Sequence, residues 1–263
     1  MKIQNVTDYL EELAPLSYAE DFDNVGLLIG NYETKISGIL VTLDSLEETV
    51  DEAITKNCNL IVSFHPIIFS GLKKLNGNTY VERVVLKAIK NDIAIYAIHT
   101  ALDNKKDGVS GKICEVLGLK NTEILIPKSN LNTHETIGMG VIGELETEMD
   151  ETTFLQFVKT TMKTECVRHS ELLGKSIKKV AVLGGSGSFA IENAIALNAD
   201  IYISSDFKYH DFFKAEKQIL LADIGHYESE QFTKNLLVEY LTKKFTNFAV
   251  ILSEKSTNPI YYS

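Results

Sequence analysis

The stretch GILVTLDSLEETVDEAITKNCNLIVSFH, residues 38–65, has the pattern of a strand, a helix and a second strand. The β-rich apolar runs at 38–43 and 59–63 predict the strands, and the residues between them repeat apolar positions at helical spacing. A third β-rich run follows at 93–98, after another segment with helical spacing. This alternation predicts an α/β fold.

The second half of the chain echoes the first. A shift of 141 residues places the predicted strand at 39–43 on residues 180–184, and it places His65 on Asp206. The match is mainly one of pattern, and it favours a duplicated α/β unit. Both halves would then carry a metal-competent side chain just after their second strand.

The predicted boundary between the two α/β domains falls after residue 128. The segment IPKSNLNTH, residues 126–134, is polar and contains a proline, as connectors often do. The predicted domains are therefore residues 1–128 and residues 129–263, with related topology.

The composition limits the classes of partner. The chain has 263 residues, of which 44% are hydrophobic, so it is long enough to bury a large core. It carries 26 basic and 36 acidic side chains, a formal charge of -10, and no basic cluster. Attraction to nucleic acid or to an anionic membrane is therefore not expected, and a small molecule or a protein partner is favoured.

The cysteines and the N-terminus favour a cytoplasmic protein. Cys58, Cys114 and Cys166 lie far apart without CxxC spacing, which is typical of buried thiols in a reducing compartment. The segment MKIQNVTDYLEELAP predicts a charged amphipathic helix and not a signal peptide. No apolar run approaches the roughly 20 residues that a membrane span needs.

Three histidines follow predicted strands. They are His65, His99 and His226, and ligands of α/β sheets collect beyond the carboxyl ends of the strands. Asp103 lies four residues after His99, and Glu230 lies four residues after His226. In a helix, this spacing places imidazole and carboxylate on one face.

A mixed set of imidazoles and carboxylates suits Zn, Fe or Mn. Taken singly, a histidine after a strand is more often a hydrogen-bonded structural residue, and a His–Glu pair at helical spacing is usually a solvated face. The recurrence after three strands favours an open metal site. Both interpretations remain open on the pattern alone.

The glycine-rich segment VAVLGGSGSFA, residues 180–190, joins a predicted strand to a predicted helix. Backbone amides at such a junction could hold a phosphate. The segment lacks the lysine of a P-loop and the full dinucleotide fingerprint, so a tight turn that needs glycine is the favoured interpretation.

Six motifs, in order along nearly the whole chain, resemble those of the GTP cyclohydrolase I type 2 homologue family, also called the Ngg-interacting-factor-like family. They are AEDFDNVGLLIG (19–30), SFHPIIF (63–69), IHTALDN (98–104), VAVLGGSGS (180–188), SSDFKYHDF (204–212) and DIGHYESE (223–230).

This resemblance implies a pair of α/β domains with a two-metal site in the cleft between them, and a ring-shaped homohexamer. It also implies that His99 and His210 line the same pocket, for substrate contact or proton transfer. The family's metal ligands fall on Phe64, His65, Asp103, His226 and Glu230.

The chain departs from the family pattern at Phe64, which stands where the family has its first histidine. A phenyl ring has no lone pair for a metal, so one of the two ions would lose a ligand. One or two ions per chain are therefore expected. Ala101, in place of an asparagine, and Ser205, in place of a glycine, are milder departures.

The implied function is that of a metal-dependent hydrolase, which activates water toward a nucleotide-like or phosphate-bearing small molecule. The alternative is a non-catalytic metal-binding ring that docks a protein partner or carries metal. The loss of a ligand at Phe64 strengthens this alternative. Metal-dependent turnover would separate the two.

Overall fold

The computed structural model describes residues 1–128 and 136–263 and divides into two compact units, each of mixed α/β structure. The first unit comprises Met1–Leu102 and Thr233–Asn258, and the second comprises Asp103–Phe232 and Pro259–Ser263.

The first unit is built on a five-stranded sheet in the order β1-β4-β3-β2-β11. Neighbouring strands among β11, β2, β3 and β4 are parallel, while β1 pairs antiparallel with β4 at the edge. The strands are β1 (Gly26–Ile29), β2 (Ile39–Thr42), β3 (Leu60–Ser63), β4 (Ala94–Ala97) and β11 (Val250–Leu252).

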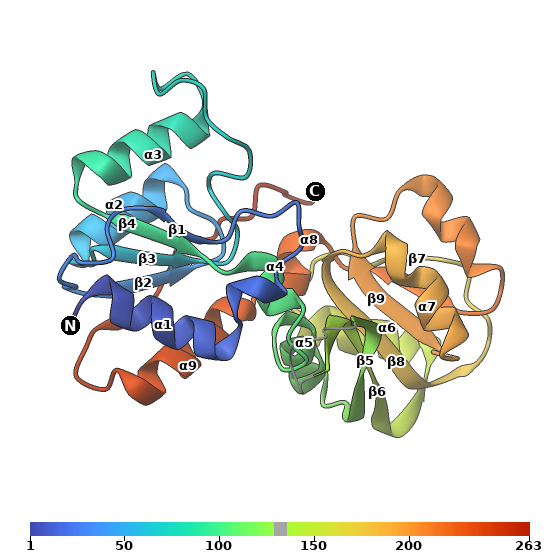
Figure 1. Ribbon diagram of the computed structural model, residues 1–263. Helices are drawn as coiled ribbons and strands as arrows, with labels where there is room; N and C mark the ends of the chain where they lie inside the picture. The colour runs from blue at the N-terminus through green and yellow to red at the C-terminus, as the bar shows by residue number, and fades with distance from the viewer. Residues whose placement is uncertain (129–135) are drawn as a thin grey trace. The chain divides into compact units, whose positions relative to one another are not determined.

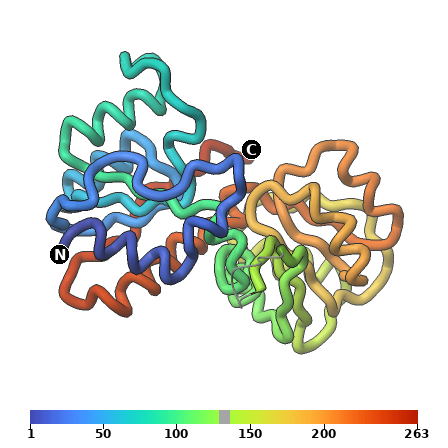
Figure 2. The backbone as a smooth tube through the Cα atoms, viewed as in Figure 1, coloured from blue at the N-terminus to red at the C-terminus, as the bar shows by residue number. Residues whose placement is uncertain are grey.

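Helices cover both faces of this first sheet, with α2 and α3 on one face and α1 and α9 on the other (Figure 1). They are α1 (Ile3–Leu13), α2 (Glu47–Thr55), α3 (Tyr80–Lys90) and α9 (Thr233–Lys244). Val50 of α2 and Val84 of α3 belong to one buried cluster with Ile61 of β3. On the opposite face the rings of Tyr9 and Tyr240 stack at 4.3 Å, so the C-terminal helix lies beside the N-terminal one (Figure 2).

The second unit is built on a six-stranded sheet in the order β5-β6-β8-β9-β10-β7. Its centre, β8-β9-β10, is parallel, and the other pairings are antiparallel. The strands are β5 (Lys120–Lys128), β6 (Ile137–Asp150), β7 (Arg168–His169), β8 (Ser176–Ser186), β9 (Ile201–Ser205) and β10 (Leu220–Asp223).

The two faces of the second sheet bury alternate residues of β8, as the period of a strand requires. Val180 and Val182 pack in the cluster that includes α5 (Val109–Leu117) and α6 (Glu151–Thr161). Ala181 and Leu183 pack in the cluster that includes α7 (Ile191–Ala196). A strand buried on both faces is therefore apolar throughout, which explains the run VAVL.

The related topology expected of the two halves is confirmed. In the first unit Ile39 of β2 pairs with Leu60 of β3, and in the second Val180 of β8 pairs with Ile201 of β9. The shift of 141 residues that aligns the sequences carries one pair onto the other. The polar residues that follow β3 and β9 are therefore equivalent in topology.

The units do not divide after residue 128. That position ends β5, which pairs with β6 inside the second sheet. The chain instead leaves the first unit inside α4 (His99–Asp103) and returns to it after Phe232. The expected connector at 126–134 falls largely on residues 129–135, which lie outside the described part of the chain.

The return is made by α9 and β11, and β11 adds a parallel edge strand to β2. The sequence pattern of a short apolar run such as β11 does not indicate which sheet it joins. Its partner is set by tertiary packing, so the sequence pattern could not assign residues 233–258 to the first unit.

The cysteines differ in burial. Cys58 and Cys114 are buried, and burial raises the pKa of the Cys114 thiol to about 12, whereas Cys166 is exposed. The expectation of three buried thiols is therefore wrong for Cys166. Within the described residues, no helix is long and apolar enough to cross a membrane.

Candidate functional site

His65 is held by an aspartate from the neighbouring strand end. It lies two residues beyond β3, and its Nδ1 donates a hydrogen bond of 2.9 Å to Asp44 Oδ1. Asp44 lies two residues beyond β2, and its other oxygen accepts from Thr257 at 2.6 Å. Because Nδ1 is committed to Asp44, coordination of a metal by His65 would use Nε2.

His99 is held in the same way by Asp23. It begins α4 with a φ of 23°, a left-handed conformation that is uncommon outside glycine and often marks functional sites. Its Nδ1 donates to Asp23 Oδ1 at 2.9 Å, and the Thr100 amide and hydroxyl donate to Asp23 Oδ2 at 3.1 and 2.5 Å. Burial raises the pKa of Asp23, but the hydrogen bonds from His99 and Thr100 outweigh it and lower the pKa to about 2.

Replacing Asp23 with asparagine is expected to lower the free energy of unfolding at pH 7 by about 2 kcal/mol, because a fully buried carboxylate with a depressed pKa is lost. A depressed pKa stabilises the fold above the unfolded-state value near pH 4, and this contribution disappears as the pH falls toward about 2. Urea unfolding at a series of pH values should therefore show the two proteins converging in that window. Asp21→Asn, at an exposed neighbour, is the matched control and should show no such convergence. A difference that stays constant down to pH 2 would contradict this role of Asp23.

Phe64 packs against both imidazoles of the first unit. Its ring is fully buried, with centroids 4.9 Å from His65 and 5.5 Å from His99. The imidazoles themselves lie 5.2 Å apart, nearly perpendicular to each other. Phe64 therefore serves as a packing residue that fixes the two histidine rings and cannot donate to a metal.

In the second unit, His226 and Glu230 lie at the two ends of the short helix α8 (His226–Glu230). His226 Nδ1 donates to Asp206 Oδ2 at 2.7 Å, while its Nε2 lies 3.3 Å from Glu230 Oε2. Asp206 follows β9 with a φ of 59° and also accepts a hydrogen bond from the Ser186 hydroxyl. The expected imidazole–carboxylate pair is thus brought together, and a third group orients it.

The electrostatics of this pair favour a cation. Burial lowers the pKa of His226, but hydrogen bonds and charge from Asp206 and Glu230 outweigh it and raise the pKa to about 11. The hydrogen bond from His226 in turn lowers the pKa of Asp206. Two carboxylates around one imidazole therefore hold a proton tightly, and a divalent ion bound there would have to displace that proton.

The glycines of β8 make room for Glu230. Gly185 has a φ of 73°, and a Cβ at this position would lie 2.4 Å from Glu230 Oε1. The Gly185 amide donates to Ser229 Oγ at 2.9 Å. The glycine-rich segment therefore allows a close approach of strand and helix, in agreement with the structural interpretation favoured for it.

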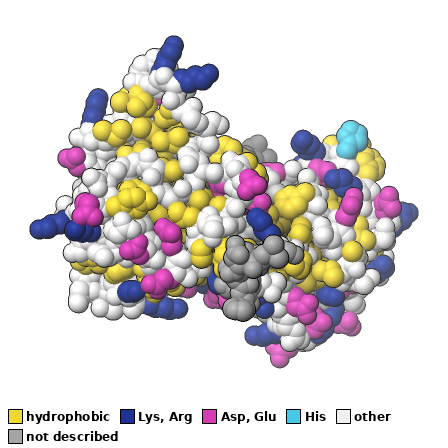
Figure 3. Space-filling view, viewed as in Figure 1, with side chains coloured by type: hydrophobic (Ala, Val, Ile, Leu, Met, Phe, Trp, Pro, Cys, Tyr) yellow, Lys and Arg dark blue, Asp and Glu magenta, His cyan; other side chains and the backbone are white. Residues whose placement is uncertain are grey.

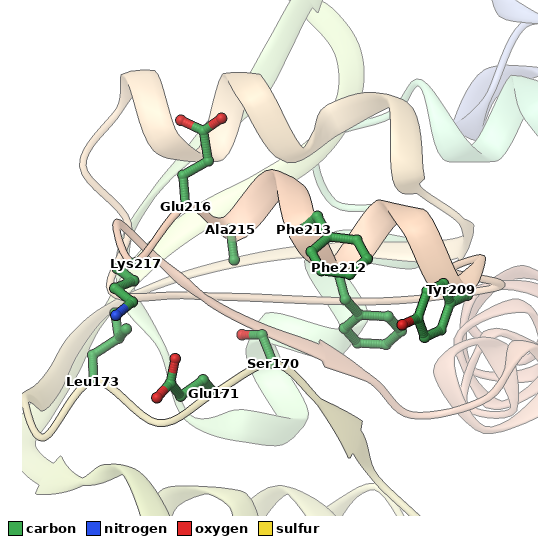
Figure 4. A pocket seen from close by; sticks show the side chains of 9 residues that line it. All are labelled: Ser170, Glu171, Leu173, Tyr209, Phe212, Phe213, Ala215, Glu216 and Lys217. Atoms are coloured by element: carbon green, nitrogen blue, oxygen red, sulfur yellow. The ribbon is translucent and has the colours of Figure 1, made fainter.

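Asp103 and His210 complete the set of predicted residues. Asp103 is half-buried at the end of α4, four residues after His99. His210 is exposed in the 3₁₀ segment η3 (Tyr209–Ala215), with its ring 5.1 Å from Tyr209 and 6.1 Å from Phe213. Tyr209 and Phe213 line a pocket of about 460 Å³ in the second unit (Figure 4).

Three aspartates that orient the histidines received no such role from the sequence. Asp44 and Asp206 follow strands, so they carry the same positional signal as the histidines. Asp23 lies in the loop before β1, and 76 residues separate it from His99. The only sequence signal for Asp23 is its place in the motif AEDFDNVGLLIG. Its pairing with His99 cannot be predicted from spacing along the chain.

Comparison with known proteins identifies the relationship. Residues 1–259 match the family model described as Duf34/NIF3 (NGG1p interacting factor 3). The chain belongs to the Duf34/NIF3 family. The resemblance inferred from the six motifs is thereby confirmed.

Relatives of this NIF3-family chain cover its whole length. A Clostridium acetobutylicum protein named GTP cyclohydrolase 1 type 2 homolog is 34% identical and aligns over 98% of both chains. The crystal structure of a Bacillus cereus protein related to NIF3 superposes with a TM-score of 0.94 at 26% identity, covering 100% of this chain and 99% of the other. A Staphylococcus aureus protein superposes with a TM-score of 0.91 at 30% identity, with the same coverage.

Proposed function

We propose that this NIF3-family protein binds one or two divalent metal ions and hydrolyses a nucleotide-like or phosphate-bearing small molecule. The metal ligands in this proposal are His65, Asp103, His226 and Glu230. The observation that carries it is the arrangement around His226, where one carboxylate orients Nδ1 and a second, buried one lies 3.3 Å from Nε2. Metal-ligating histidines are oriented by such a carboxylate on the other nitrogen.

The donor set fits a divalent ion. His65, His226 and Glu230 supply two imidazoles and one carboxylate, a combination suited to Zn, Fe or Mn. His65 carries the same orienting carboxylate as His226, which holds Nδ1 and directs coordination to Nε2. When bound, the ion would polarise a water molecule or a substrate oxygen.

His99 is proposed to move a proton in the reaction. Its Nδ1 donates to the buried carboxylate of Asp23, so Nε2 is the basic nitrogen of the neutral ring. An imidazole held in one tautomer by an aspartate is an effective general base. His210 is proposed to contact the substrate, since its ring is exposed beside two aromatic residues.

The assembly is inferred from the family resemblance, whereas the location is inferred from the spacing of the cysteines and from the charged N-terminal segment. A homohexameric ring and a cytoplasmic location are expected, with no nucleic-acid or membrane partner. The formal charge of -10 supports the absence of a nucleic-acid partner.

The test is metal-dependent turnover. Protein loaded with Zn, Fe or Mn should hydrolyse members of a panel of nucleotides and phosphoesters, and Asp103→Ala should reduce the rate by about 100-fold or more, because a ligand is lost. Asp107→Ala, at an exposed position four residues further on, is the matched control and should keep the rate.

Turnover that survives Asp103→Ala, or that is unaffected by chelation, would contradict the proposal. Metal binding with stable capture of a protein partner and no turnover would favour the non-catalytic ring instead. The buried phenyl ring of Phe64, which takes the place of one family ligand, is the observation that favours this second function.

A further inference from the structure

Two phenyl rings stand exposed together in the first unit. The side chains of Phe22 and Phe69 are 67% and 51% exposed, and their ring centroids lie 6.3 Å apart at an angle of 52°. Figure 3 shows hydrophobic side chains exposed on one face of this unit. A contacting pair of exposed aromatic rings is a candidate surface for binding an aromatic ligand.

Hydrogen bonds fix the loop of Phe22 to the loop of Phe69. Asn24, two residues after Phe22, donates from its Nδ2 to the carbonyl of Ile68, the residue before Phe69, at 2.5 Å. The two loops are therefore joined by a side-chain-to-backbone hydrogen bond, and the pair does not depend only on the weak contact between the two rings. Such preorganisation lowers the entropic cost of binding a ligand.

The same loop is tied to the helix that carries His99. The Glu20 amide donates to Thr100 Oγ at 3.0 Å, and Asp23 accepts from both His99 and Thr100. The ring of Phe69 lies 6.5 Å from that of His99 in an edge-on arrangement. The side chain of His99 is 18% exposed, so a ligand resting on the two phenyl rings would border an accessible imidazole.

We propose that Phe22 and Phe69 form an aromatic platform, which binds the planar heteroaromatic ring of the substrate with its polar edge toward His99. Phenyl rings tilted against each other offer one face and one edge, the two contacts that aromatic ligands prefer. Two phenylalanines expose at most a few hundred Å², less than the roughly 800 Å² per partner of a stable protein interface. A small ring is therefore the favoured occupant over a second copy of the chain.

This inference rests on the proposed function and narrows it. A nucleotide-like or phosphate-bearing molecule could be recognised by its phosphate alone or by its ring. The platform assigns recognition to the ring, and a purine nucleoside without phosphate should then bind. The platform residues are not metal ligands, so ring binding and metal binding can be measured separately.

The chain contains no tryptophan, so Phe22→Trp creates a protein with a single reporter. Guanosine should quench its fluorescence saturably after correction for absorption, because the indole stacks on the purine. Ribose, which lacks the ring, should not. Ile89→Trp is the matched control: Ile89 is 52% exposed on α3 of the same unit, and its reporter should show no saturable quenching. Equal quenching of both reporters would overturn the proposal.

Calorimetry provides a second test of the platform, because it measures guanosine affinity in variants that carry no tryptophan. Phe22→Ala and Phe69→Ala should each weaken guanosine binding about 5- to 100-fold, the range for loss of one aromatic stacking partner. Metal content should be unchanged in both. Unaltered guanosine affinity would overturn the platform, and so would a smaller oligomer in either variant, which would assign the surface to a contact between copies. Absence of metal from the unmodified protein would instead defeat the proposed function.

Discussion

Replacing Glu230 with glutamine is expected to reduce bound metal to less than about a tenth of an equivalent per chain, a loss of about 100-fold in affinity. The Glu230 side chain is only 4% exposed, and its Oε2 lies 3.3 Å from His226 Nε2. The amide keeps the shape of the carboxylate but removes its charge and half of its donor oxygens. Metal analysis after incubation with Zn, Fe or Mn and removal of excess ion provides the measurement.

Glu228→Gln is the control for this experiment. Glu228 lies in the same short helix and is similarly buried, at 6% exposed, but the pair with His226 belongs to Glu230. Glu228→Gln should therefore retain metal. Equal loss of metal in both variants would show that the charge of the helix, and not ligation by Glu230, determines occupancy.

Glu230→Gln should also change the titration of His226. With one of its two acidic neighbours neutralised, the pKa of His226 should fall below about 11, while Asp206 still holds it above the ordinary value of 6.5. NMR titration of the histidine ring protons in metal-free protein would report this shift.

The strand ends could be predicted from the sequence because each is marked locally. The apolar runs of β3 and β10 stop at a defined point, and the polar residue that follows must lie at the carboxyl edge of the sheet. That reasoning found His65, His226 and the spacing to Glu230. The structure confirms that His226 and Glu230 approach each other.

The orienting network could not be predicted in this way. The hydrogen-bonded partners are far apart along the chain. The separation is 21 residues for Asp44 and His65 and 20 residues for Asp206 and His226. It is 76 residues for Asp23 and His99. These pairings depend on which strands are neighbours in the sheet and on how loops fold over it. Spacing along the chain carries neither kind of information.

Phe64 replaces a family metal ligand with a side chain that packs against the neighbouring histidines. From the sequence it is only a missing ligand. In the structure it is a buried ring in contact with both imidazoles of the first unit, so the position keeps a role in fixing His65 and His99. Loss of one donor therefore leaves the orientation of the remaining histidines intact.

Replacing Asp223 with alanine is expected to lower the free energy of unfolding by about 3 to 5 kcal/mol, the cost of breaking a buried charged network. Asp223 ends β10, is 4% exposed and accepts hydrogen bonds from the amides of Phe207 at 2.9 Å and Gly225 at 3.1 Å, with Arg168 as its ion-pair partner. Phe207 follows Asp206, and Gly225 precedes His226. The carboxylate therefore fastens together the two loops that carry the Asp206–His226 pair, and metal affinity should fall along with stability.

Arg168→Ala separates the hydrogen bonds that Asp223 accepts from two backbone amides from the contacts made by Arg168. The Arg168 side chain is 55% exposed, so its removal should cost only about 1 kcal/mol and leave Asp223 bound to both amides. Denaturant unfolding and metal analysis of the two variants should therefore rank Asp223→Ala as the more damaging in both measurements. If Arg168→Ala proves equally destabilising, the contacts of Arg168 with Asp223 and with the Phe207 carbonyl are what hold the loops. If Asp223→Ala unfolds more readily yet keeps full metal affinity, the loops do not depend on Asp223 to position His226.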